Sequence, residues 1–136
     1  MTSVKCVLIG MRFMKNHNRL IDHITLRVRN LEKSREFYRA LAETLGFAID
    51  REEVDRFFVE GLQIIQNPEP SQSVHLAFKA SNPASVRHFH DQALKLGSHS
   101  LSAPAATFAD KAHFSARVRD PDGNNIEVVY EHQKLF

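Results

Sequence analysis

The sequence contains a single cysteine, Cys6, so no disulfide can form within the chain. One cysteine suits a reducing compartment, and we expect a cytoplasmic protein. No apolar stretch approaches the roughly 20 residues that a membrane-spanning helix needs. No basic run appears either, because the 18 basic and 16 acidic residues are intermixed and leave a net charge of +2. These shortages argue against a membrane or nucleic-acid partner.

Length and composition are those of a soluble globular domain. The 136 residues suit one domain or two small fused modules, and a hydrophobic content of 43% is enough to build a core. Residues 1–19 lack the cleavage site and the long apolar region of a signal peptide. We expect them to be an extension outside a domain at 20–136. An edge strand at residues 4–9 is the alternative.

Two segments of the chain resemble each other. DHITLRVRNLEKSREFYRALAETLG begins at Asp22, and VHLAFKASNPASVRHFHDQALKLG begins at Val74. His23 aligns with His75 and Asn30 with Asn82, both at the same offset (75 − 23 = 82 − 30 = 52). An internal repeat of this kind sets the architecture, because each copy predicts one structural unit.

Each copy begins with an alternating strand and continues with a helix. Asn30 and Asn82 suit the N-cap position, and Gly46 and Gly97 suit the stop. Short strands follow, with DPDG at 120–123 as a strong turn signal. Each module is therefore βαβββ, and the fold class is α+β. The further strands are expected at 47–51, 54–60 and 62–66, then at 98–101, 113–119 and 125–130, with a linker at 67–73 and a long loop at 102–112.

Glu127 lies inside the apolar strand IEVVY, where an ionised carboxylate needs a partner. Alternation puts Ile126 and Val128 on the helix side and Glu127 on the other. No lysine or arginine close in sequence is clearly aimed at it. If the strands form one curved sheet, His23 and His75 converge on the same side. Two imidazoles and one carboxylate are a donor set used for divalent transition metals.

Three stretches, IDHITLRVRNLEKSREFY, VHLAFKA and RDPDGNNIEVVY, resemble the vicinal oxygen chelate superfamily, which is also called the glyoxalase, bleomycin-resistance and dioxygenase superfamily. The resemblance covers residues 21–130. It implies two βαβββ modules, at about 20–66 and 73–130, that form a cupped incomplete barrel with the helices outside. It also implies a homodimer, and a divalent Fe, Mn, Ni or Zn ion held by His23, His75 and Glu127.

Two positions depart from relatives in this superfamily. Gln63 aligns with Glu127 between the modules, where many relatives have a glutamate as the fourth ligand. Arg117 stands where extradiol dioxygenases carry a tyrosine, which argues against ring cleavage. His113 shares the parity of Arg117 and is the candidate general acid or base beside Glu127. A solvent-exposed strand end is the alternative for His113.

Arg27, Lys79 and Arg117 have cup-facing parity and could bind a carboxylate or phosphate, with Gln63 as a further substrate contact. Strand ends also carry charge simply because they reach solvent. The sequence therefore favours a metal-dependent enzyme acting on a small oxygen-rich molecule, of lyase, isomerase or dioxygenase type. The alternative is a metal-free binding or drug-sequestering protein. The other histidines are predicted to lie at the surface: His17, His88, His90, His99 and His132.

Overall fold

The computed structural model describes residues 20–107 and 112–132, which form an α+β fold of two modules. The predicted extension at 1–19, with its alternative strand at 4–9, lies outside the described residues. Of the helices in the described ranges, none is both long and apolar enough to cross a membrane.

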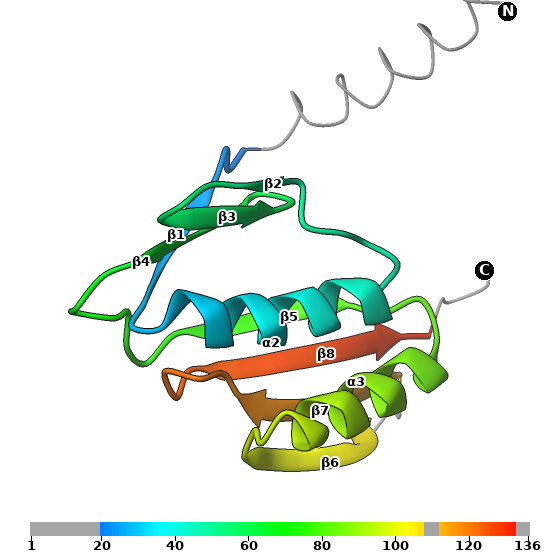
Figure 1. Cartoon of the computed structure of the whole chain (residues 1–136). Coiled ribbons are helices and arrows are strands. Elements are labelled where there is room, and N and C mark those ends of the chain that lie inside the picture. Colours follow the sequence, from blue (N-terminus) through cyan, green and yellow to red (C-terminus); the bar gives the residue numbers. More distant parts are fainter. Residues whose placement is uncertain (1–19, 108–111, 133–136) are drawn as a thin grey trace, which may run out of the picture.

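The first module is a four-stranded sheet with one helix (Figure 1). Its strand order is β1-β4-β3-β2, and β1 runs parallel to β4. The β3–β4 turn is tight, and Glu60 adopts a left-handed conformation there, at φ 52°, just before Gly61. The elements are β1 (Ile24–Val28), α2 (Leu31–Thr44), β2 (Arg51–Glu52), β3 (Arg56–Val59) and β4 (Leu62–Gln66).

The second module repeats this plan. Its strand order is β5-β8-β7-β6, and β5 runs parallel to β8. The predicted turn between β7 and β8 is confirmed, with Gly123 at φ 91°. The elements are β5 (His75–Lys79), α3 (Pro83–Lys95), β6 (Ser100–Thr107), β7 (His113–Arg119) and β8 (Asn125–Glu131).

The two modules share one register, which confirms the predicted repeat. Thr25 pairs with Gln63 between β1 and β4, just as Ala77 pairs with Glu127 between β5 and β8. Both helices begin at the expected asparagine, whose side chain accepts a hydrogen bond from the backbone N–H three residues on. Such a cap stabilises a helix by about 1 kcal/mol. Gln63 and Glu127 therefore occupy equivalent positions.

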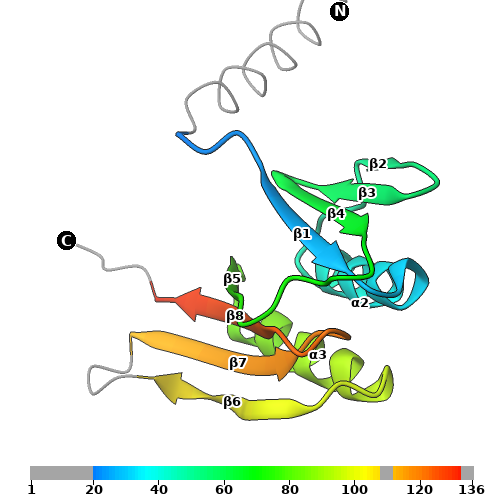
Figure 2. The same cartoon turned by 90° about the vertical axis from the view of Figure 1, so that its left-hand side faces the viewer.

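The core lies between each helix and its sheet and continues from one helix to the other. Phe37 of α2 and Phe89 of α3 are buried and meet edge to face, with ring centroids 6.4 Å apart. In Figure 1, α2 lies between the two sheets and α3 lies against the second sheet. Figure 2 shows the sheets as separate layers, and within one chain they do not join into a single sheet.

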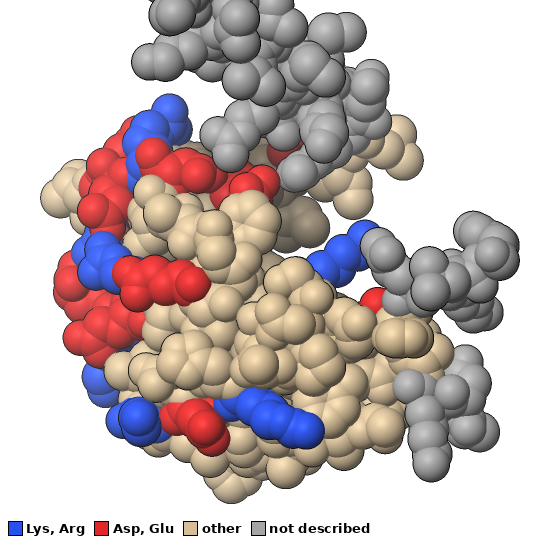
Figure 3. Space-filling view, turned by 90° about the vertical axis from the view of Figure 1, so that its right-hand side faces the viewer, with Lys and Arg blue, Asp and Glu red and all other residues tan. Residues whose placement is uncertain are grey.

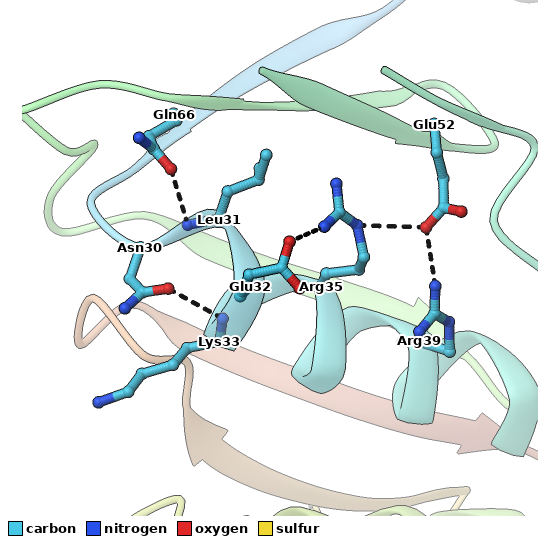
Figure 4. Close-up of polar contacts among 8 residues, drawn as sticks. All are labelled: Asn30, Leu31, Glu32, Lys33, Arg35, Arg39, Glu52 and Gln66. Carbon is cyan, nitrogen blue, oxygen red and sulfur yellow. Dashed lines mark hydrogen bonds and ion pairs between the residues drawn. The ribbon is translucent and has the colours of Figure 1, made fainter. Parts of the chain in front are cut away.

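The short strand β2 is anchored to α2 by charged side chains (Figure 4). The Glu52 carboxylate accepts a hydrogen bond from the Arg39 guanidinium at 2.7 Å, and it forms an ion pair with Arg35, whose Nε lies 3.1 Å away. Arg35 also pairs with Glu32, and only 14% of its side chain is exposed. Surface ion pairs contribute up to about 1 kcal/mol each. Here they hold a strand of two residues that, within the described part of the chain, pairs with β3 alone.

One predicted loop is wrong over most of its length. Strand β6 continues to Thr107, whereas a loop had been expected from residue 102 to 112. The pairing with β7 shifts register between Ser100 and Ser102, and again between Ser102 and Ala105. An edge strand tolerates both a proline and such bulges, so Pro104 does not end it. Residues 108–111 lie outside the described residues.

The surface position predicted for His90 is also wrong. His90 of α3 is only 7% exposed, and its Nε2 lies 2.8 Å from the Ser100 hydroxyl on β6. The histidine therefore joins the helix to the edge strand of its own sheet. A buried imidazole with a hydroxyl partner satisfies one of its two ring nitrogens, which removes much of the penalty of burial.

Candidate functional site

The face of the second sheet turned away from α3 carries the residues singled out by their parity. Along β8, Ile126 and Val128 are fully buried, and Glu127 between them is half-buried on the other side. Along β5, His75 and Lys79 are exposed. The predicted sidedness of Glu127 is therefore the sidedness observed.

His75 and Glu127 meet on this face. The imidazole Nε2 lies 2.9 Å from the carboxylate Oε1, and the two side chains are 53% and 20% exposed. The contact follows from the parallel pairing of β5 with β8, which brings both side chains to one side of the sheet. Imidazole nitrogen and carboxylate oxygen are both ligands of divalent transition metals.

Arg117 of β7 is a second neighbour of Glu127. The antiparallel register puts the two residues directly opposite each other. The expectation concerned lysines and arginines close to Glu127 in the sequence, and strand pairing adds a cation from ten positions earlier. The Arg117 Nε donates to the Ser102 hydroxyl on β6 at 3.2 Å, which fixes the guanidinium. Ser102 was not identified from the sequence, where it was assigned to a loop.

His23 is not brought to this pair within one chain. It precedes β1, its side chain is 60% exposed, and its Nδ1 lies 2.8 Å from the Asp22 carboxylate. Among the residues that the structure describes, His, Cys, Asp and Glu form no group of three or more that could hold a metal ion. A single chain thus assembles two of the three predicted ligands.

Gln63 lies on the corresponding face of the first sheet. Its Nε2 donates to the Thr25 hydroxyl at 2.9 Å, and its Oε1 accepts from the Arg56 guanidinium at 3.2 Å. Gln63 is therefore held between β1 and β3 by its two neighbours. Arg56 was not identified as a site residue from the sequence, although it lies two positions before Phe58 on β3 and therefore shares its face of the sheet.

The remaining candidates lie apart from one another. Arg27 and Lys79 are exposed at equivalent positions of β1 and β5, so they belong to different sheets. His113 lies opposite Glu131, with its Nε2 3.8 Å from that carboxylate. Glu131 is four residues beyond Glu127, or roughly 13 Å at the usual rise of a strand. His113 therefore faces the opposite end of β8 from the His75–Glu127 pair.

A cavity of about 1170 Å³ opens between the two modules. Its apolar wall includes Leu41, Leu45 and Phe47 from the first module and Phe78 from β5. A smaller adjoining hollow of about 490 Å³ includes the exposed Ile24, and neither cavity includes His75 or Glu127. In Figure 3 charged side chains gather along one edge of the molecule, and much of the described surface beside it is uncharged.

Comparisons with known proteins agree with this fold. The family model described as Glyoxalase/Bleomycin resistance protein/Dioxygenase superfamily matches residues 20–128. A solved glyoxalase/bleomycin resistance protein from Albidiferax ferrireducens T118 is 29% identical, with a TM-score of 0.70, and the match covers 83% of this chain and 99% of that one. Among curated proteins, none matches.

Two more distant structures share the fold alone. A lactoylglutathione lyase from Agrobacterium tumefaciens is 20% identical, with a TM-score of 0.59, over 81% of this chain and 92% of that one. Oxidase ChaP-H2 is 18% identical, with a TM-score of 0.63, over 84% of this chain and 94% of that one.

Proposed function

The chain belongs to the glyoxalase/bleomycin resistance protein/dioxygenase superfamily, and we propose that it is a metal-dependent enzyme acting on a small, oxygen-rich anion. The main support is the 2.9 Å contact between His75 and Glu127 on an open sheet face. We place the protein in the cytoplasm, because a chain with one cysteine cannot form the internal disulfides that are typical of proteins in oxidising compartments.

His75 and Glu127 fit a divalent metal by their chemistry and by their closeness. Their donor atoms, His75 Nε2 and Glu127 Oε1, lie 2.9 Å apart, and neither side chain is fully buried. His23 is the proposed third ligand, which makes a set of two imidazoles and a carboxylate suited to Fe, Mn, Ni or Zn. When bound, such an ion acts as a Lewis acid on a substrate oxygen. Gln63 is the proposed neutral contact on the equivalent strand.

The complete site is proposed to form between two copies of the chain. One chain does not group His23 with His75 and Glu127 in its described part. Strands β1 and β5 each lie at an end of their sheet, so each has an edge that a second copy could face. Apolar residues beside these edges are exposed, including Ile21 at 61% and Ile24 at 45%. A homodimer would cover them, and closed twofold symmetry would give two equal sites.

The charges around the pair support an anionic substrate. Arg117 lies opposite Glu127, and its guanidinium is oriented by Ser102. A guanidinium held in this way can bind a carboxylate or phosphate with two parallel hydrogen bonds. Arg27 and Lys79 are exposed on the open faces and would add positive charge to the assembled site. His113 would transfer protons only at the far end of a ligand that extends along β8.

The test is elemental analysis of protein purified without added metal, followed by calorimetric titration with Mn²⁺, Fe²⁺, Ni²⁺ and Zn²⁺. The proposal expects one ion per chain at saturation, and binding that is lost in His75→Ala. A protein that carries no metal and takes up none would instead support the metal-free binding protein. A panel of small carboxylates and phosphate esters with adjacent oxygens then defines the reaction.

A further inference from the structure

The turn between β7 and β8 contains a buried carboxylate that contacts both modules. Asp120 is 4% exposed, and its Oδ2 accepts a hydrogen bond from the Tyr38 hydroxyl at 2.7 Å. Tyr38 belongs to α2 of the first module, and it is 1% exposed. The two residues are 82 positions apart, so this contact joins the modules rather than stabilising a local turn.

Asp120 is also the acceptor around which its own turn is built. Its Oδ1 accepts from the backbone N–H groups of Asp122 at 3.0 Å and Asn124 at 2.8 Å. Its Oδ2 also accepts from the Asn124 amide at 3.2 Å. Four donors compensate the burial of one carboxylate. Burial, followed by the charge of Asp120, raises the pKa of Tyr38 well above its usual value, so the tyrosine remains a hydrogen-bond donor.

Asn124 extends this cluster to the strand that carries His75. Asn124 is 1% exposed, and its Oδ1 accepts from the Val74 N–H at 3.0 Å. Its amide nitrogen donates to the Ser71 carbonyl in the linker at 3.3 Å. The Val74 carbonyl in turn accepts from the Asn125 N–H at 2.9 Å. These hydrogen bonds join Val74 to Asn124 and Asn125 at the start of β8. Val74 directly precedes His75, the residue that contacts Glu127.

A third contact returns to the first module. The Asp122 carboxylate accepts from the backbone N–H of Arg29, between β1 and α2, at 3.2 Å. The turn at 120–124 therefore contacts α2, the end of β1, the linker and the start of β5. We propose that Asp120 and Asn124 are positioning residues of the metal site: they hold His75 against Glu127 and set the angle between the modules.

This inference rests on the proposed metal role of His75 and Glu127. If the site forms between two copies, the angle between modules decides where His23 of one copy stands relative to the pair of the other. Neither positioning residue needs to touch the metal for this effect. Mutating a residue that supports a metal ligand without touching the metal typically weakens metal binding by about 10- to 100-fold. We expect the loss in Asn124→Ala to fall in this range.

The experiment compares Asn124→Ala and Tyr38→Phe with Thr44→Val. Thr44 lies in the same helix as Tyr38, and its hydroxyl donates to the Ala40 carbonyl at 2.7 Å, so the control loses a side-chain hydrogen bond away from the turn. Zn²⁺ affinity, thermal stability, amide exchange at Val74 and the ring-nitrogen signals of His75 are measured on each full-length protein. The last two are recorded without metal.

The expected result is Zn²⁺ binding about tenfold or more weaker in Asn124→Ala, with faster exchange at Val74 and shifted His75 signals. Tyr38→Phe should change the same quantities in the same direction by less, and Thr44→Val should change none beyond a small loss of stability. If Asn124→Ala does not fold, Tyr38→Phe alone decides. Wild-type affinity together with unchanged His75 signals in the folded variants would overturn the inference.

Failure of the proposed function gives a different pattern. If the wild-type protein binds no Zn²⁺, the metal role is wrong, and positioning is then judged from the metal-free readouts. Unchanged Val74 exchange and His75 signals in both variants would overturn it in that case as well.

Discussion

Arg117 and Glu127 lie directly opposite each other on β7 and β8, on the sheet face that α3 leaves uncovered. The carboxylate also lies 2.9 Å from the His75 imidazole, and its side chain is 20% exposed. Opposite charges at facing positions of an antiparallel pair stabilise a sheet by about 0.2–1 kcal/mol. The same arrangement places a fixed cation beside a potential metal ligand, where an anionic substrate would be bound.

Arg117→Met should weaken the binding of an anionic substrate. Loss of a hydrogen bond to a charged group costs about 1.5–3 kcal/mol, so KM should rise roughly 10- to 100-fold. Arg119→Met is the control, because Arg119 is the next residue of β7 on this face and its guanidinium donates to the Gly123 carbonyl. Steady-state kinetics on the substrate found in the panel provides the measurement. Equal KM values for the two variants would assign Arg117 to a solvated surface.

Glu127→Ala should remove metal binding while the fold survives. The helix-facing residues Ile126 and Val128 are untouched, so the thermal midpoint should stay within a few degrees of wild type. Metal affinity should fall more than about a hundredfold, beyond the effect of outer-shell changes. Glu127→Gln keeps the shape of the side chain without its charge, so its metal affinity should lie between those of wild type and Glu127→Ala.

Glu131→Gln is the matched control for this strand, since Glu131 shares the face of Glu127 and pairs with His113 instead. Titration calorimetry with Ni²⁺ and Zn²⁺ measures each variant. If Glu127→Ala bound metal with wild-type affinity, the carboxylate would not be a metal ligand, and its role would be to interact with His75 and Arg117.

Two variants that each fail to bind metal should restore metal binding when they are mixed. His23→Ala lacks the proposed ligand before β1, and His75→Ala lacks the ligand on β5. If each site combines His23 of one copy with His75 and Glu127 of the other, a mixed dimer contains one intact site. Random exchange between twofold dimers then restores roughly a quarter of all sites.

The mixing experiment uses co-refolded chains, and bound metal is counted by elemental analysis. The control is the double variant His23→Ala/His75→Ala mixed with wild type, whose mixed dimers contain no intact site. After random exchange only the wild-type dimers should bind metal, at roughly a quarter of all sites, whereas a site within one chain would leave half of all sites intact. No recovery in the first mixture would place the site within one chain. A monomeric mass by light scattering at micromolar concentration would also contradict the dimer.

Asp122→Asn should change how stability depends on pH. Burial, opposed by the hydrogen bond from the Arg29 N–H and aided by the charge of Asp120, raises the pKa of Asp122 above 3.8. The folded chain therefore holds this proton more tightly than the unfolded chain, and the stability it contributes is lost as pH rises from 3.8 through the folded pKa. Above this window the ionised carboxylate opposes folding.

The amide introduced by Asp122→Asn cannot ionise, so the variant should be more stable than wild type at pH 7, and the two should approach each other near pH 4. Urea unfolding at several pH values between 4 and 7 measures the difference. An advantage of the variant that grows as pH falls would contradict the sign.

Local features of the fold could be predicted from the sequence. The caps at Asn30 and Asn82 depend on a side chain and a backbone N–H three residues away. The turn at Gly123 depends on a conformation with positive φ that glycine adopts easily. The sidedness of Glu127 follows from alternation along one strand. All of these depend on neighbours within a few residues, so short-range periodicity is enough to predict them.

The contacts that make the site depend on residues distant in the chain. Arg117 faces Glu127 because of the β7–β8 register, and Ser102 orients Arg117 because β6 continues into the region expected to be a loop. Tyr38 reaches Asp120 across 82 positions, and the buried His90 finds its hydroxyl partner, Ser100, on β6. Strand pairing and helix packing decide these neighbours through shape and burial summed over the whole core, which no short stretch encodes.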